Sequence, residues 1–583
     1  MTPEPHPDQQ DTPTAPPAAP GPREEDGPPR AAPGPREEGG PPREAPGARG
    51  SAAATGLRRE TLAAAWRRAR GQEWLAGLWG RVPGHGWLAG LWRRRVRGHG
   101  WFAGVLAAGV ALRVAAMLGY RPALWFPDTY TYVVTVFRPR PDLVRPAGYS
   151  MFLKLFEPLH SFAVVTAAQH LLGLATGVLV YVVAVRRAPR WAATLAAVPV
   201  LLDAYQVELE HLLVSDTLFM FLVVAAVALA LRGRPPVVAI GLLLAAATLT
   251  RTVGQPFVVL AVAWVALRGR LRPAVTLLAV ALVPILAYGA WFYAAHQRVG
   301  LVGANGVFLY ARTMSFADCA EMNPPPDLRT LCDPRPPSRR PPSQEYIWSK
   351  DSPLVARPGI TFTEETDALA GRFARLAITS QPLDYAASVL SELGRTFTWD
   401  RPVYPDPEIY GYYQFPRTPP GPPGRYPARV GAQFAERYEQ GPIGTRIVEP
   451  FAGWLRGYQA VARVPGSLLL VALLTPPAAA LWRRRSANRG PRGGAWRRVP
   501  DRLLPWSAGR GPRVGAWRRV PDWLVPWSAA VVLLVVPAAV AEFDYRYVLP
   551  AAPLAFLAAA LGLRGRSEEG KGFVKDIPRN VRA

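Results

Sequence analysis

Several common signals are missing from this 583-residue sequence. It contains no glycine-rich phosphate loop and no P-loop signature, so nothing in it predicts a nucleotide site. Residues 1–100 lack the apolar region of a cleavable signal peptide, so we expect the first apolar segment to act as a signal anchor. Cysteine is scarce, with two residues in all, and 42 acidic residues face 68 Lys and Arg. What the chain has in abundance is arginine and long apolar blocks.

The apolar residues are gathered into blocks of about 16–25 residues that are separated by arginine clusters. This pattern is typical of a polytopic helical membrane protein. The blocks cover residues 101–120, 161–185, 191–206, 212–231, 236–250, 253–267, 273–294, 465–482, 527–542 and 548–563. We therefore predict an all-α membrane protein with about ten transmembrane helices and one large extracytoplasmic loop domain.

The net charge of +26 is also explained by a membrane protein. A basic soluble protein would suggest nucleic acid as a partner. Here the arginines flank apolar blocks, so anionic lipid headgroups are the better match for the positive charge. We expect the lipid bilayer, and no nucleic acid, as a partner.

Charge also predicts the orientation in the membrane. If the N-terminus is cytoplasmic, every inside connection is basic, at Arg186/Arg187/Arg190, Arg232/Arg234, Arg268/Arg270/Arg272, Arg483–Arg485 and Arg564/Arg566. The outside connections then hold the carboxylates Asp128, Asp203, Glu208, Glu210, Asp216, Glu542 and Asp544. The first outside loop is an exception, because it also carries Arg121, Arg138, Arg140, Arg145 and Lys154. We predict a multi-pass protein of the cell membrane with a cytoplasmic N-terminus.

Composition divides the chain further. The first 55 residues are rich in Pro, Gly, Arg and Glu and lack the apolar residues that would offset their ordering entropy. The expected regions are a disordered, basic cytoplasmic region at 1–100, a transmembrane core at 101–294, an extracytoplasmic loop domain at 295–464, C-terminal transmembrane helices at 465–564 with a basic cytoplasmic loop at 483–526, and a cytoplasmic tail at 565–583.

Both cysteines lie in the large outside loop, thirteen residues apart, at Cys319 and Cys332. Outside the cytoplasm a disulfide is the natural interpretation, and two free thiols are the alternative. A disulfide closing this loop would stabilise the fold by up to about 3 kcal/mol on a chain-entropy estimate.

The first candidate for chemistry is Asp128, in the run FPDTYTY just beyond the first predicted crossing. A carboxylate held at a membrane surface near an arginine suits chemistry on a lipid-linked substrate. The plain alternative is a loop or helix-capping aspartate. We expect Asp128 to share one outward-facing cavity with the acidic group around Glu210.

That second group lies in VELEHLLVSDTLF, residues 207–219, at the mouth of the fourth apolar block. Asp216 falls about one turn inside the block, where an ionisable residue is a functional candidate by default, although Ser215 and Asp216 could simply cap the helix. Glu210 and His211 could ligate a divalent cation, Mg²⁺ or Mn²⁺, together with water and phosphate oxygens. The predicted metal ligands are Glu210 and Asp216.

Three arginines lie on the same predicted face: Arg145 in RPAGY, Arg251 in LTRTVGQP and Arg546 in EFDYRYVLP. Arginine forks bind phosphate oxygens bidentately. The alternative is that they snorkel to lipid headgroups. With Tyr149 and Tyr547 from the same motifs, we expect them to form a pocket for a pyrophosphate or phosphate ester.

These motifs resemble those of the GT-C superfamily of membrane glycosyltransferases, particularly its protein O-mannosyltransferase and lipid A aminoarabinose transferase branches. The matching pieces are PDTYTY, RPAGY, LLVSDTLF and RYVLP, within residues 100–300 and 540–563. The resemblance implies transfer of a sugar from a polyprenyl-phosphate donor to an extracytoplasmic acceptor. It implies that Asp128 is the catalytic base, that Asp216 or Glu210 supports a metal or the acceptor, and that Arg251 and Arg546 hold the lipid phosphate.

Two rival functions remain open. A transporter or a flippase for lipid-linked substrates would also place polar residues at the mouths of its spans, although no repeated halves are visible among the apolar blocks. The other is a membrane scaffold without catalysis.

Overall fold

The structure is a computed structural model that describes residues 98–359, 361–419, 421, 424, 426–488 and 520–563. The expected disordered N-terminal region up to residue 97, residues 489–519 of the basic loop and the tail at 565–583 lie outside these residues. The described chain is mostly helical. Its strands are β1 (Tyr120–Arg121) and β2 (Arg446–Ile447), which pair antiparallel.

Each of the ten apolar blocks contains a helix. In chain order these helices are α4 (Gly100–Gly119), α7 (Phe162–Val185), α8 (Arg190–Leu202), α10 (Asp216–Ala230), α11 (Val237–Thr250), α12 (Gln255–Leu267), α13 (Leu271–His296), α23 (Gly466–Asn488), α24 (Leu524–Val540) and α26 (Ala552–Gly562). The helical class of the prediction is therefore confirmed, and the block boundaries agree with the helix ends to within a few residues.

Fewer helices than the predicted ten qualify as membrane spans by length and composition. Within the described residues, five helical segments are long and apolar enough to cross a membrane: Gly100–Gly119, Phe162–Val185, Leu271–His296, Gly466–Ser486 and Tyr545–Gly562. A sixth is added if α8 and α9 (Ala204–His211), which bend by 48° at Asp203, count as one span. The other four apolar helices have fewer than 18 residues, short of the roughly 20 that a bilayer requires.

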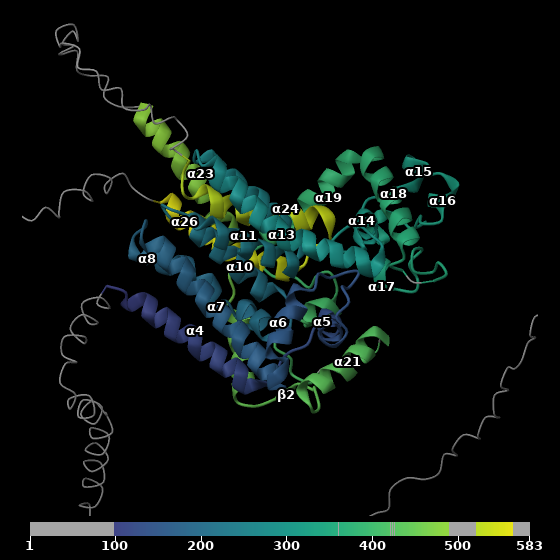
Figure 1. Ribbon diagram of the computed structural model, residues 1–583, viewed down its shortest axis with the longest axis horizontal. Helices are drawn as coiled ribbons and strands as arrows, with labels where there is room; N and C mark the ends of the chain where they lie inside the picture. The colour runs from purple at the N-terminus through teal and green to yellow at the C-terminus, as the bar shows by residue number, and fades with distance from the viewer. Residues whose placement is uncertain are drawn as a thin grey trace, which may run out of the picture. The chain divides into compact units, whose positions relative to one another are not determined.

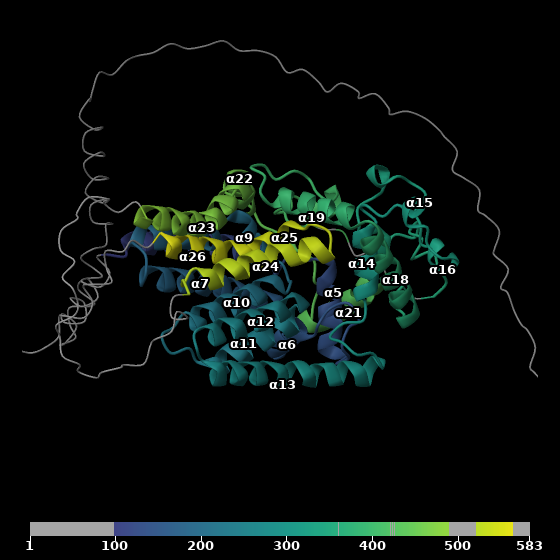
Figure 2. The same ribbon diagram turned by 90° about the horizontal axis from the view of Figure 1, so that it is seen from above.

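The apolar helices pack against one another around a shared core (Figures 1 and 2). Helix α7 packs against α8 and α10, and α11 packs between α10 and α13. From the C-terminal part of the chain, α26 packs against α23, α24 and α8. The two ends of the described sequence thus contribute to one bundle.

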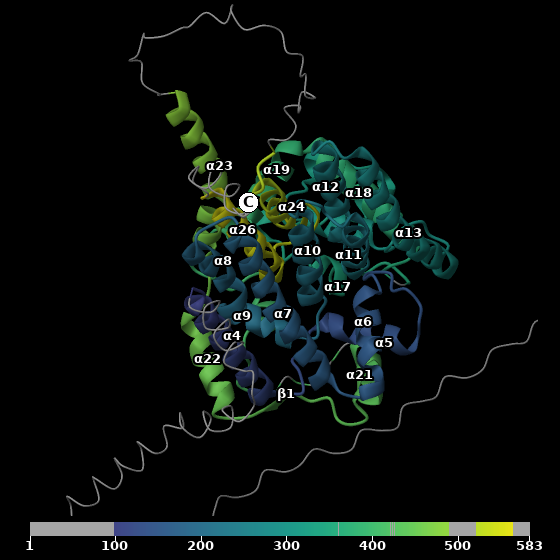
Figure 3. The same ribbon diagram turned by 60° about the vertical axis from the view of Figure 1, so that its left-hand side comes forward.

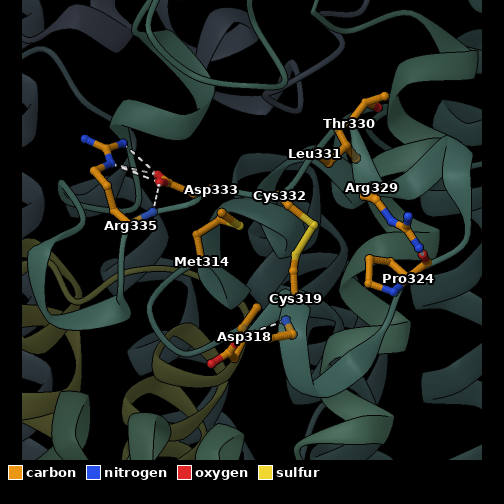
Figure 4. The surroundings of a disulfide bond; sticks show 12 residues. Met314, Asp318, Cys319, Pro324, Arg329, Thr330, Leu331, Cys332, Asp333 and Arg335 are labelled. Atoms are coloured by element: carbon orange, nitrogen blue, oxygen red, sulfur yellow. Dashed lines mark hydrogen bonds and ion pairs between the residues drawn. A yellow bond between two sulfur atoms is a disulfide. The ribbon is translucent and has the colours of Figure 1, made fainter.

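Residues 295–464 do not share a single core. Helices α14 (Asn305–Thr313) and α18 (Glu364–Ser380) pack together with three short helices around a core of their own (Figure 1). This unit contains the disulfide between Cys319 and Cys332 (Figure 4). The three short helices are α15 (Cys319–Met322), α16 (Pro326–Arg329) and α17 (Glu345–Trp348).

The rest of this segment returns to the bundle. Helix α19 (Pro382–Thr396) packs against α24, α21 (Tyr426–Glu439) against α5 (Pro127–Phe137), and α22 (Phe451–Val461) against α4. Figure 3 shows α21 beside α5 and α6 (Gly148–Phe156). Aromatic residues of the segment, including Tyr413, Phe415 and Tyr438, complete apolar clusters built from residues 116–165. The expected single loop domain is therefore one small helical unit plus segments integrated with the bundle.

The remaining elements are short. They are α20 (Pro407–Gly411), α25 (Tyr545–Val548) and the 3₁₀ turns η1 (Glu157–Leu159), η2 (Thr252–Gly254), η3 (Pro337–Arg339) and η5 (Leu549–Ala551).

Candidate functional site

A cavity of about 610 Å³ lies where residues 125–145, the small helical unit and the segment before α25 meet. Its size is within the range of small-molecule sites. Its wall combines aromatic side chains with charged and other polar ones. The lining includes Trp125, Phe126, Asp128, Arg145, Phe308, Arg312, Trp348, Tyr412, Glu542, Asp544, Arg546 and Tyr547.

The start of α5 positions Asp128. Pro127 occupies the first helical turn, where its missing N–H costs nothing. The Phe126 N–H donates to the Thr129 hydroxyl (3.1 Å), and that hydroxyl donates to the Leu213 carbonyl (2.8 Å). These bonds fix the turn, and Asp128 lies in it as the one acidic residue of the first turn, facing the cavity.

Two arginines hold the Asp128 carboxylate. Arg145 NH2 donates to Oδ1 (2.5 Å) and Arg546 NH1 donates to Oδ2 (3.1 Å). We call Asp128, Arg145 and Arg546 the arginine clamp. Its members are 17 and 418 residues apart in the sequence, so packing alone brings them together.

Each arginine of the clamp is positioned by a second carboxylate. Asp142 Oδ1 accepts the Arg145 backbone N–H (2.9 Å), which shapes the loop before α6. Asp544 caps α25, accepting the Arg546 backbone N–H on Oδ1 (3.1 Å), and its Oδ2 lies 3.2 Å from Arg546 Nε. The Tyr413 hydroxyl donates to the same Oδ2 (2.7 Å).

The clamp controls the protonation of Asp128. Burial alone would raise the pKa of this carboxyl. The positive charges of Arg145 and Arg546 outweigh burial and hold the pKa of Asp128 well below its usual range. Asp128 is thus an anion at any physiological pH, with both oxygens engaged by guanidinium groups.

Asp216 and Arg251 form an ion pair immediately behind the clamp. The Arg251 guanidinium lies 5.1 Å from the centre of the Tyr547 ring, and that of Arg546 lies 5.4 Å from the same ring. Tyr547 lines the cavity, whereas Asp216 and Arg251 are absent from its lining. Asp216 Oδ2 is buried without a hydrogen-bond partner in the part of the chain that the structure describes.

Tyr149 is placed differently from the prediction. Its hydroxyl donates to Gln169 Oε1 (2.7 Å), and its ring packs edge-on against Tyr132. It is fully buried and does not line the cavity. Tyr149 supports the site only through Tyr132, whose hydroxyl donates to Ser215. Burial raises the pKa of Tyr132 to about 12, so it stays neutral.

Glu210 and His211 lie in a separate network inside the bundle. The Glu210 carboxylate accepts two bonds from Arg113 (2.7 and 2.8 Å), one from Gln206 (3.1 Å) and one from His170 (3.0 Å). His170 in turn contacts His211, whose other ring nitrogen lies 2.6 Å from the Tyr120 carbonyl. Neither residue lines the cavity, so the expectation that Asp128 and Glu210 share it is wrong.

The chain uses a glycine to admit this network. A Cβ on Gly173 would lie 2.0 Å from Glu210 Oε1, so α7 needs a residue without a side chain there. We call Arg113, Glu210, His170 and His211 the bundle network. Its hydrogen-bonding capacity is satisfied internally, as burial of charge in a helix bundle requires.

The predicted metal ligands do not fit a shared cation. Glu210 is bound by Arg113 and Asp216 by Arg251, so each carboxylate already has a different cationic partner. Across the described residues, no group of three or more His, Cys, Asp and Glu side chains is arranged to hold a metal ion. We therefore assign no chemical step to a metal.

The sequence prediction missed several residues of the lining, among them Arg312, Trp348, Glu542 and Asp544. For Glu542 and Asp544 a signal existed, because both stand in the same EFDYRY run as Arg546. Nothing near Arg312 or Trp348 in the sequence indicated a site. Residues of the small helical unit line the cavity because of the tertiary fold, which no local sequence pattern indicates.

No family model, no curated protein and no solved structure matches this chain. The geometry of the site is therefore the basis for a proposed function.

Proposed function

We propose that this chain is an integral-membrane glycosyltransferase that moves a sugar from a polyprenyl-phosphate donor to an extracytoplasmic acceptor. In this proposal the chain is a multi-pass protein of the cell membrane, its ten apolar helices all lie within the bilayer, and its N-terminus is cytoplasmic. The cavity then opens on the outer side.

The observation that carries the proposal is the arginine clamp. Two guanidinium groups converge on one carboxylate at the wall of a cavity. A phosphate monoanion or phosphodiester presents oxygens of the same kind and spacing as a carboxylate, and arginine binds both. Asp128 therefore occupies the place that a donor phosphate takes when it binds.

The clamp also suits the chemistry of transfer. As the bond between the anomeric carbon and the phosphate oxygen breaks, negative charge grows on the departing phosphate. Preformed donors aimed at developing charge are among the largest contributions to catalysis. Arg145 and Arg546 are positioned in advance by Asp142 and Asp544, so the two arginines keep their places when a phosphate replaces Asp128. Arg251 lies behind Tyr547, where Asp216 neutralises its charge.

The test is transfer by the full chain in nanodiscs, with a panel of radiolabelled hexoses and pentoses on C55 polyprenyl phosphate. We expect Arg145→Gln and Arg546→Gln each to lower transfer about 100-fold, the usual cost of removing one charge-stabilising donor. Arg372→Gln is the matched control, because Arg372 forms an exposed ion pair with Asp327 outside the cavity lining.

Two results would contradict the proposal. One is transfer that both clamp variants leave intact. The other is a wild-type chain that transfers no sugar yet moves a labelled lipid-linked substrate across the bilayer, which would make it a transporter or flippase.

A further inference from the structure

Glu542 is a second carboxylate on the wall of the cavity that contains the clamp. It stands between the end of α24 and Asp544, the residue that caps α25. Its main chain is therefore only four residues from Arg546. Both residues belong to the same EFDYRY run of the sequence.

Main-chain groups of the small helical unit hold the Glu542 carboxylate in place. The Ser343 N–H donates to Oε1 (3.0 Å) and the Gln344 N–H donates to Oε2 (3.2 Å). Oε1 also accepts the Tyr404 hydroxyl (3.4 Å), whereas Oε2 accepts one neutral bond and retains a lone pair. No arginine, lysine or histidine forms an ion pair with Glu542 within the described residues.

A second layer surrounds this carboxylate. The Tyr404 hydroxyl lies 3.4 Å from Glu542 Oε1 and 3.1 Å from Glu392 Oε1. Glu392 also accepts the Phe543 N–H (2.8 Å). The other charged groups nearby are Arg395, 3.7 Å from Glu392, and Arg312, whose guanidinium donates to Ala538, Ser315 and Ser388. Glu542 therefore faces one carboxylate, one phenol and two arginines that are bound elsewhere.

Glu542 and Asp128 differ as proton acceptors. Both oxygens of Asp128 are taken by guanidinium groups, and the pKa of Asp128 lies well below its usual range. Burial, with a smaller contribution from Glu392, raises the pKa of Glu542 to about 7. A general base works best when its pKa lies near the working pH.

We propose that Glu542, rather than Asp128, accepts the proton of the acceptor hydroxyl during sugar transfer; this rests on the proposed function. The acceptor O–H bond breaks and its proton goes to a Glu542 oxygen. The acceptor oxygen forms a bond to the anomeric carbon. The bond from that carbon to the phosphate oxygen breaks, and its electron pair leaves on polyprenyl phosphate in the clamp. Glu542 then releases the proton to water.

The roles are thereby divided within one cavity. Asp128 holds the two arginines in register until a donor phosphate replaces it. Glu542 handles the proton. The clamp needs an anion at every pH, and the base needs a group that exchanges its proton near neutrality, so one carboxylate could not serve both purposes well.

The experiment compares Glu542→Gln, Glu542→Asp and Glu365→Gln with the wild-type chain in nanodiscs, using the same donor panel. Glu365→Gln is the control, because Glu365 is an exposed glutamate of α18 that does not line the cavity. We expect Glu542→Gln to lower kcat/KM by 10²–10⁴-fold, the usual range for losing a general base. Glu542→Asp should retain part of the activity. Binding of C55 polyprenyl phosphate without sugar should change less than about threefold.

The pH profile separates a proton acceptor from a residue that only anchors Ser343 and Gln344. Wild-type kcat/KM should rise in proportion to hydroxide up to about pH 7 and then level off, because Glu542 must be deprotonated to act. The residual activity of Glu542→Gln should lack this rise. The profile needs only the wild-type chain, so it remains decisive if Glu542→Gln fails to fold.

Each contrary result has a distinct meaning. If the wild-type chain transfers sugar and the kcat/KM of Glu542→Gln stays within threefold of the wild-type value, the role of Glu542 is overturned and the proposed function stands. A wild-type kcat/KM that does not change between pH 5.5 and 8 has the same meaning. Absence of transfer by the wild-type chain from every donor in the panel overturns the proposed function, and the role of Glu542 with it.

Discussion

The arginine clamp and the bundle network have the same chemical parts and different surroundings. Each pairs a carboxylate with at least one arginine. In the bundle network the side chains of Glu210 and Arg113 are 0% and 3% exposed, and Glu210 accepts four hydrogen bonds. In the clamp, Asp128, Arg145 and Arg546 are 12%, 18% and 11% exposed and face a cavity.

Under the proposed function, this difference separates charges that support the fold from charges that bind a ligand. A network whose members satisfy one another inside a bundle leaves no group for a ligand to bind. An ion pair on a cavity wall can exchange one partner for a ligand of the same charge. Charge near membrane depth is therefore a signal of function only when some of its bonding partners can be replaced.

The largest effect should come from breaking the bundle network. Replacing Glu210 by Ala leaves Arg113 buried beside His170 with no anion, and the loss of one partner of a buried pair costs about 3–5 kcal/mol. We expect Glu210→Ala to yield little monodisperse protein and to lower the thermal midpoint sharply. The measurement is thermal unfolding in detergent micelles, followed by size-exclusion chromatography.

The matched variant is Asp128→Asn, which removes the carboxylate of the clamp. Because Arg145 and Arg546 face a cavity that water can enter, we expect this variant to fold and to unfold at nearly the wild-type temperature. If Glu210→Ala and Asp128→Asn lower the thermal midpoint equally, the proposed difference between the bundle network and the clamp is wrong.

A second, smaller effect is expected on the affinity for C55 polyprenyl phosphate. If Asp128 occupies the place of a donor phosphate, its removal should strengthen the binding of C55 polyprenyl phosphate. We expect Asp128→Asn to bind about tenfold more tightly, a gain of about 1.4 kcal/mol from lost competition for the two arginines. Titration calorimetry in nanodiscs measures this, with Arg372→Gln as control. Weaker binding by Asp128→Asn would contradict the exchange of partners.

Much of the fold was predictable, because apolar blocks bounded by arginine specify helices almost residue by residue. All ten blocks contain helices, and the two strands are too short to leave a pattern. The number of crossings was harder to predict, since a helix buried among other helices needs less length than one that faces lipid. Helix α10, with most of its residues buried, is such a case.

The sequence predicted individual residues of the site, but it did not predict which of them are in contact. Asp128, Arg145 and Arg546 were selected separately, and only packing shows that one carboxylate joins the two arginines. Glu210 and His211 lie outside the cavity lining, and Glu210 pairs with Arg113 from the first apolar block. An arginine in the middle of such a block was itself a signal of a buried counter-ion. Glu542 was visible as a carboxylate, but its burial and its main-chain partners come from a segment about 200 residues away.

The smallest expected change in affinity tests whether Arg251 belongs to the clamp. Asp216 neutralises Arg251, which lies against the same tyrosine ring as Arg546. Without the Asp216 carboxylate, Arg251 has an uncompensated positive charge near the bound phosphate, although it does not contact the phosphate. We expect Asp216→Asn to bind C55 polyprenyl phosphate roughly threefold more tightly at 50 mM salt, about 0.7 kcal/mol for charges that do not touch.

Salt identifies the cause of this effect. The gain in Asp216→Asn is long-range, so it should shrink at 0.5 M salt, where the screening length falls to roughly 4 Å. The gain in Asp128→Asn comes from direct competition at hydrogen-bond distance and should persist. If both gains disappear with salt, the clamp acts only as a diffuse positive field. If neither changes, Asp216 competes for the ligand directly, and Arg251 belongs to the clamp rather than behind it.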